Sequence, residues 1–249
     1  PTKSGLMTLT CEPTGSLVHA TALDRSGATF AARDSGEQEF LASDDTWFRP
    51  VDLEEGPDGN LYVIDMYRAV IEHPEWVPKE LQNRADERDG EDRGRIWRVR
   101  RKETPRTVAA VRLGETPREK LLDIPAGALP WEIETRFRLV SELSDPTSTP
   151  ALRSLAHEHP QPAVRSRALG TLFSRGELVE GDILAAMADT SSDVRAVVTS
   201  LANRRQLITP AVAALLQKAS QTATGRELFE VALASAGDPS PAAISTWSQ

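Results

Sequence analysis

Three segments of similar sequence recur at nearly equal intervals in the second half of the chain. They begin at Arg136, Arg165 and Arg195, so the offsets are 29 and 30 residues. Each is followed by a second apolar segment with helical periodicity. A helix pair that recurs in this way cannot bury its apolar face alone and stacks on its neighbours. The pattern predicts an α-solenoid of HEAT-like helical repeats over residues 131–249.

Residues 1–103 carry a different pattern, in which short β-rich runs alternate with turn residues. The runs Val51 to Leu53 and Leu61 to Asp65 flank a turn at Pro57-Asp58-Gly59, which predicts a hairpin, and Arg95 to Arg101 offers a third strand. Short strands at regular spacing are typical of a β-sandwich or a β-propeller. Prolines and glycines over residues 104–130 predict a linker, so the fold class is multi-domain, β then α.

Chain length, net charge and cysteine content limit the class of protein. A chain of 249 residues favours two domains, and a net charge of −8 argues against nucleic acid as a partner. No apolar run is long enough to cross a bilayer. A single cysteine, Cys11, leaves the redox compartment undecided, and no Cys-x-x-Cys-His motif is present to hold a c-type haem. The chain begins with Pro1, and we expect it to be a piece of a longer protein.

A long insertion, residues 66–92, follows the second strand of the hairpin and is typical of loops that carry a site. Asp65, Tyr67, Arg68 and His73 lie where the chain leaves the strand. A carboxylate, a guanidinium and an imidazole in this position could bind an anionic cofactor or accept a proton or hydride equivalent. The structural alternative is that Asp65 caps the turn at Tyr67-Arg68 and that His73 packs beside Pro74.

Two further arginines, Arg49 and Arg93, flank the same stretch. A planar bidentate donor suits the recognition of a carboxylate or a phosphate. The alternative is an ion pair with a nearby acid such as Asp44, Asp45 or Asp92, because most arginines pair on protein surfaces.

Other polar clusters have simpler interpretations. The run Asp86 to Asp92 holds five carboxylates around a glycine but lacks the ligand spacing of a calcium loop, which favours a solvated loop and no metal site. The basic residues of Arg95 to Lys102 alternate with apolar ones and indicate an exposed strand face. No Gly-x-Ser-x-Gly motif and no glycine-rich phosphate loop is present.

Together, the motifs of the first part resemble one particular family. They are Trp47-Phe48-Arg49-Pro50-Val51-Asp52, Gly56 to Arg68, Ile71-Glu72-His73-Pro74 and Asp92 to Val99. They are similar to those of the membrane-bound dehydrogenases of planctomycetes and verrucomicrobia. In these large exported proteins a propeller similar to glucose/sorbosone dehydrogenases precedes HEAT-like repeats and usually a c-type cytochrome domain. The resemblance covers about residues 10 to 101 and extends to the order of the helical repeats.

The resemblance implies that residues 1–103 are the terminal blades of a propeller, with the insertion 66–92, in an oxidoreductase acting on sugars or alcohols. It implies a periplasmic or cell-surface location, pyrroloquinoline quinone and calcium as cofactors, and electron transfer to a haem domain outside this chain. We therefore expect this piece to be inactive alone. The site hypothesis takes His73 and Asp65 as catalytic and Arg49, Tyr67, Arg68 and Arg93 as cofactor ligands.

The second functional hypothesis is a non-catalytic scaffold. Here the β domain and the HEAT-like array present surfaces to a partner protein or a polysaccharide, because repeat arrays are scaffolds more often than active sites.

Overall fold

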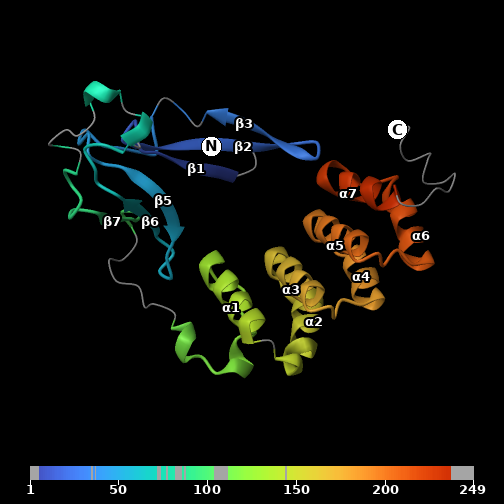
Figure 1. The fold of residues 1–249 in the computed structure, drawn as a ribbon. Coiled ribbons are helices and arrows are strands. Elements are labelled where there is room, and N and C mark those ends of the chain that lie inside the picture. Colours follow the sequence, from blue (N-terminus) through green and yellow to red (C-terminus); the bar gives the residue numbers. More distant parts are fainter. Residues whose placement is uncertain are drawn as a thin grey trace. The chain divides into compact units, whose positions relative to one another are not determined.

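A computed structural model of the chain describes residues 6–34, 36, 38–71, 74–76, 78–81, 86, 88–103, 112–143 and 145–236. Strands occupy the first part of the chain and helices the second (Figure 1). This order confirms the predicted β then α layout. The chain divides into two compact units, one of residues 1–24 and 31–111 and the other of residues 25–30 and 112–249. The boundary after residue 111 falls inside the predicted linker, 104–130.

The first sheet holds β1 (Leu6–Glu12), β2 (Leu17–Ser26), β3 (Thr29–Asp34) and β4 (Leu41–Ala42), with β2 between β1 and β3 and also paired with β4. Its strands β1 and β2 are antiparallel and pair from Leu6 with Leu23 to Glu12 with Leu17. Along β2 the side chains of Val18, Ala20 and Ala22 are buried, and the residues between them are half-buried. The period of two is the one that a strand over an apolar core requires.

The second sheet has the strand order β5 (Pro50–Glu55), β6 (Leu61–Asp65), β7 (Arg95–Val99). The β5–β6 pair is the predicted hairpin, and β7 is the predicted third strand. At the turn, Gly59 has a φ of 68°, a left-handed conformation that glycine adopts without steric cost. Val63 of β6, Phe48 and Val18 of β2 form one small core.

The predicted β-propeller is wrong. The described residues form two small antiparallel sheets, of four and three strands, and no closed ring. A propeller needs at least about four blades of about four strands each. Strand periodicity and turn residues report only local structure. The pattern left a sandwich and a propeller open, the resemblance favoured the propeller, and the same pattern is equally compatible with separate small sheets.

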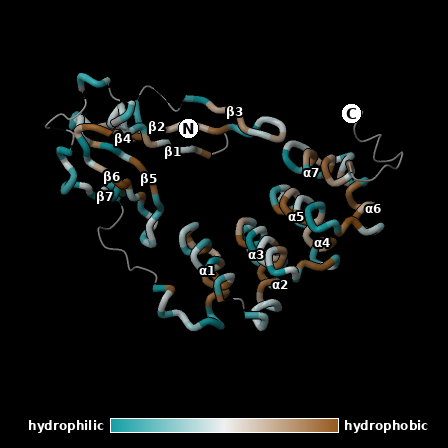
Figure 2. Tube along the Cα trace, in the orientation of Figure 1, coloured by the Kyte–Doolittle hydropathy of each residue, from teal (hydrophilic) through white to brown (hydrophobic). Residues whose placement is uncertain are grey.

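Seven α-helices follow in the described residues, in the part of the chain where the sequence predicts helical pairs. They are α1 (Pro130–Leu143), α2 (Thr149–Glu158), α3 (Pro162–Ser174), α4 (Glu180–Met187), α5 (Ser192–Arg204), α6 (Pro210–Ala219) and α7 (Gly225–Ser235). Apolar and polar residues alternate along them (Figure 2). The apolar ones share one continuous core that includes Phe137, Leu152, Leu172 and Ile183. Across the described parts of the chain, no helix has the length and apolar character needed to cross a membrane.

Part of the predicted linker belongs to this core. Residues Leu121, Leu122, Ile124 and Ala128 are buried and pack with the helices. Two short 3-10 helices, Leu113–Glu115 and Arg118–Lys120, precede them. Prolines and glycines therefore mark irregular backbone here, but this backbone covers the start of the helical array.

The three arginines whose spacing predicted the repeats make the same contact. Each donates through Nη1 to two consecutive main-chain carbonyl oxygens that precede its helix. The acceptors are Lys120 and Leu121 for Arg136, His159 and Pro160 for Arg165, and Asp189 and Thr190 for Arg195. This recurrence supports the predicted repeat, and the HEAT-like type remains a prediction.

Arg165 also binds the side chain of Asp189 in a bidentate pair, with Nε–Oδ2 and Nη2–Oδ1 distances of 2.7 and 2.8 Å. Each side chain is 9% exposed. Burial alone raises the pKa of the Asp189 carboxyl, but the hydrogen bonds from Arg165 and from the Ser191 amide outweigh it and lower the pKa below its ordinary value of 3.8. The pair is therefore charged throughout the neutral range.

Replacing Asp189 by Asn tests this pair. A carboxyl with a lowered pKa in the folded state contributes stability above its ordinary pKa and loses it as the pH falls through the folded pKa. We expect D189N to lower the free energy of unfolding at pH 7 by roughly 3 kcal/mol. The deficit should shrink as the pH falls below 3.8. Urea unfolding across this pH range measures it, with D123N, at an exposed carboxylate, as control. An unchanged deficit at low pH would contradict the linkage.

Candidate functional site

The predicted site lies where β6 ends, and its centre is the carboxylate of Asp65. The Asp65 side chain is fully buried. Its Oδ1 accepts hydrogen bonds from the main-chain N–H groups of Tyr67 and Arg49, both at 2.9 Å, and its Oδ2 accepts one from the Trp97 indole, also at 2.9 Å. The guanidinium of Arg95 lies 3.8 Å away. Asp65 therefore caps the turn after β6, which is the structural alternative that the sequence left open.

The turn that Asp65 caps has an unusual backbone. Tyr67 has a φ of 52°, in the left-handed region that non-glycine residues seldom adopt. Main-chain hydrogen bonds from Met66 to Arg49 and from Arg68 to Trp47 extend the pairing past the end of β6. The Asp65 carboxylate stabilises this conformation because it satisfies the Tyr67 amide directly.

Arg49 is bound by main-chain carbonyl groups. Its Nε donates to Arg68 O at 3.0 Å, its Nη2 to Ala69 O at 3.1 Å, and its Nη1 to Pro13 O at 2.7 Å and Thr14 O at 3.4 Å. Four of the five N–H groups of the guanidinium are thus used within the chain. Among the residues that the structure describes, Arg49 does not make the alternative ion pair with Asp44, Asp45 or Asp92, and its ligand role stays a prediction. Arg49 joins the end of β6 to the turn between β1 and β2.

Aromatic and charged side chains surround the Tyr67 ring. The Tyr67 hydroxyl donates to Asp45 Oδ2 at 2.9 Å, and the Arg95 guanidinium lies 3.8 Å from the ring centroid. Trp47 packs edge-on at 5.8 Å. The hydrogen bond to Asp45 raises the pKa of the Tyr67 hydroxyl, and the Trp47 amide together with that hydroxyl lowers the pKa of Asp45. Tyr67 is therefore a protonated donor at neutral pH.

Of the remaining predicted residues, Arg68 and Arg93 are described. Arg68 is half-buried, and its Nη1 has no hydrogen-bond partner among the described residues. The Arg93 side chain is 65% exposed and lies 3.8 Å from Asp92. His73 lies outside the described residues, as does Glu72. The structure thus brings together Asp65, Arg49 and the Tyr67-Arg68 turn.

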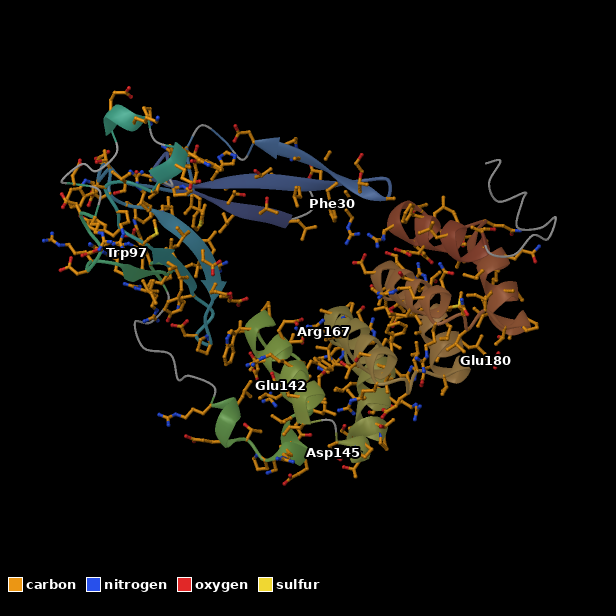
Figure 3. All side chains as sticks on the ribbon, viewed as in Figure 1. Phe30, Trp97, Glu142, Asp145, Arg167 and Glu180 are labelled. Carbon is orange, nitrogen blue, oxygen red and sulfur yellow. The ribbon has the colours of Figure 1, made fainter. Side chains whose placement is uncertain are left out.

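Three residues of this cluster were missed by sequence reasoning. Arg95 and Trp97 were assigned to an exposed strand face, and Asp45 was considered only as a partner for Arg49. The strand register contained the missing signal, because β7 places Arg95 directly opposite Asp65. Trp97, labelled in Figure 3, lies two residues further along the same strand and so on the same face.

The two ends of the insertion 66–92 meet beside this turn. The Ala69 amide donates to Asp89 O at 3.1 Å. Gly90 has a φ of 93°, and a Cβ placed on it would lie 2.3 Å from Tyr67 O. Only glycine permits this approach. The carboxylates of Asp89, Glu91 and Asp92 are exposed, which agrees with a solvated loop.

Two of the predicted ligands for the implied cofactors have few donors to offer. Pyrroloquinoline quinone is a carboxylate-bearing anion that requires free donors, but Arg49 has one N–H left and the Tyr67 hydroxyl already donates to Asp45. Within the described residues, the free donors among the predicted ligands are on Arg68 and on the exposed Arg93. Both oxygens of Asp65 accept hydrogen bonds from within the chain. Where the structure describes the chain, no three His, Cys, Asp or Glu side chains gather in a metal-binding group.

Comparison with known proteins gives one family match. Residues 1–103 match the model of a family described as a domain of unknown function (DUF7133). The match spans the β part of the chain and includes the Asp65 cluster. No curated protein and no solved structure was found to match the chain.

We expect the Asp65→Asn variant to be destabilised by on the order of 3 kcal/mol. Asn offers one acceptor oxygen for three buried donors, and each donor left without a partner costs about 1–3 kcal/mol. Urea unfolding followed by tryptophan fluorescence measures the change. Asp92→Asn, at a side chain 84% exposed, is the matched control. Equal stability of the two variants would contradict the capping role of Asp65.

Gly90→Ala tests the close approach of the loop to Tyr67. Both the contact with Tyr67 O and the positive φ oppose a Cβ, so we expect a loss of roughly 2 kcal/mol in a thermal or urea melt. Gly27 has a φ of 56° with nothing within 4 Å of a Cβ. Gly27→Ala therefore reports the cost of positive φ alone, and an equal loss in both variants would show that the contact with Tyr67 is unimportant.

Proposed function

We propose that the chain is a non-catalytic scaffold in which the helical array binds a partner protein. One observation supports this function above the others. The charged residues for which the sequence predicts chemistry make hydrogen bonds within the folded chain. Asp65 accepts from two amides and an indole, and Arg49 donates to four carbonyl groups. A catalytic carboxylate needs a free acceptor atom facing the substrate, and a cofactor-binding arginine needs free N–H donors facing the cofactor.

The helical unit supports the same proposal. Its helices share one core, and its Arg165–Asp189 and Arg195–Glu227 ion pairs join successive helical pairs. Arrays of this kind are held by neighbour contacts and present extended surfaces, which suits recognition of another polypeptide.

The dehydrogenase hypothesis makes a different prediction for the same chain. In it the β unit belongs to an exported sugar or alcohol oxidoreductase that holds a quinone and passes electrons to a c-type cytochrome domain. Its location, substrate and electron acceptor all remain predictions from the resemblance. Its cofactor site, however, requires Arg49, Tyr67 and Asp65 to give up hydrogen bonds that the folded chain already makes.

Titration with pyrroloquinoline quinone in the presence of Ca²⁺ separates the two functions. For a scaffold we expect no saturable heat in calorimetry and no saturable quenching of tryptophan fluorescence at micromolar chain. Stoichiometric uptake would overturn the proposal. In that event a tenfold loss of affinity in Arg93→Gln, roughly 1.4 kcal/mol, would assign the quinone to the predicted residues.

A further inference from the structure

A cavity of about 240 Å³ lies within the helical unit, among the ends of α4, α5, α6 and α7. Its walls combine apolar side chains with a few polar groups, a composition typical of binding sites. Met187, Leu215 and Val231 supply apolar surface, and Thr199 and Lys218 supply polar groups. None of these residues takes part in the Asp65 cluster.

The Thr199 hydroxyl is the first sign of a ligand. Thr199 is 2% exposed, yet among the described residues its hydroxyl neither donates nor accepts a hydrogen bond. Comparable hydroxyls in the same array turn back onto their own helix: Thr171 donates to Arg167 O at 3.0 Å and Ser235 to Val231 O at 2.8 Å. The Thr199 hydroxyl is therefore available to a ligand that enters the cavity.

The charge at the cavity is positive. Arg195 binds Glu227 through two hydrogen bonds, of 2.6 and 2.7 Å, so these two lining residues neutralise each other. Lys218 is exposed and makes no ion pair among the residues that the structure describes. The remaining unit of positive charge favours a carboxylate as the polar part of a ligand.

The volume limits the size of that ligand. At about 240 Å³ the cavity is below the usual range for a drug-sized ligand, about 300–1,000 Å³. The space suits a single residue that carries both an aliphatic side chain and a carboxylate, and the C-terminal residue of a polypeptide has both.

We propose that this cavity binds the C-terminal aliphatic residue of a partner protein. The carboxylate pairs with Lys218, a polar atom of the terminal residue bonds with the Thr199 hydroxyl, and the side chain packs against Met187, Leu215 and Val231. The inference rests on the proposed scaffold function and specifies the chemistry of the partner. Capture of a terminal carboxylate is a known mode of peptide recognition.

The methionine methyl groups provide the test. The chain has three methionines, and Met187 is the one at the cavity, with Met7 and Met66 in the β unit as internal references. The full chain, labelled with ¹³C at the methionine methyl groups, is titrated with the peptide acetyl-Gly-Ser-Leu that ends in a free carboxylate. We expect a saturable shift of the Met187 signal and constant signals from Met7 and Met66.

Three control peptides separate the parts of the ligand. The same peptide with an amidated end lacks only the charge, and acetyl-Gly-Ser-Gly with a free carboxylate lacks only the aliphatic side chain. We expect each to bind at least about tenfold more weakly. Acetyl-Leu-Glu-Leu-amide carries an internal carboxylate. If it binds as tightly as the first peptide, or if the amidated peptide does, the assignment to a terminal residue is overturned.

Matched variants tie the shift to the cavity. Lys218→Gln and Thr199→Val should each weaken binding by about tenfold, whereas Lys120→Gln, at another exposed lysine, and Thr171→Val should not. Thr199→Val should melt no lower than the parent chain, because its hydroxyl has no partner to lose, and Thr171→Val should melt lower. Unchanged binding in both cavity variants, or no shift of Met187 with the first peptide, overturns the proposal.

The two proposals fail in different experiments. Stoichiometric uptake of quinone would overturn the scaffold function and leave any Met187 shift as an independent property of the helical unit. Absence of a Met187 shift, with no quinone uptake, would show that this cavity is not the binding site. The scaffold function would then stand, with another surface binding the partner.

Discussion

In both units of the chain, a guanidinium group that donates to main-chain carbonyl oxygens holds a chain reversal in place. Arg49 does so between the β1–β2 turn and the end of β6, and Arg165 and Arg195 do so at the starts of their helices. Arg136, in the middle of α1, does so for the carbonyls of Lys120 and Leu121. Carbonyl groups at reversals have no partner in a helix or a sheet, so they must find donors elsewhere when they are buried. Arginine suits this task because its five N–H groups can serve several acceptors at once.

Much of the fold could be predicted because its signals are local. The hairpin at Pro57-Asp58-Gly59 depends on turn chemistry, and the helices depend on apolar periodicity with arginines at a fixed spacing. The closure of strands into a propeller is not local, since it depends on how many sheets meet and in what order. The burial of Leu121, Leu122 and Ile124 could not be predicted, because they stand among prolines and glycines that indicated a linker. Their burial depends on helices that follow them in the chain.

The candidate site shows the same limit at the level of single residues. Its location was predicted, and Asp65, Tyr67 and Arg49 do meet there. Their roles depend on which atoms face them. The Trp97 indole and the Arg95 guanidinium come from a strand thirty or more residues away in sequence, and carbonyls of Pro13 and Thr14 come from another turn. Residue type alone does not tell a carboxylate that performs chemistry from one that accepts buried amides.

The Arg195–Glu227 pair has a consequence for how the helical unit moves. It fastens α7 to α5 at the wall of the cavity, whereas the Arg165–Asp189 pair fastens an earlier step of the array. In an array held by neighbour contacts, one step can open while the others stay closed. At the last step the ion pair adds to the apolar packing of Val231 and Ala234 of α7 within the shared core, so an occupant that contacts both helices would reinforce this end of the array against local opening.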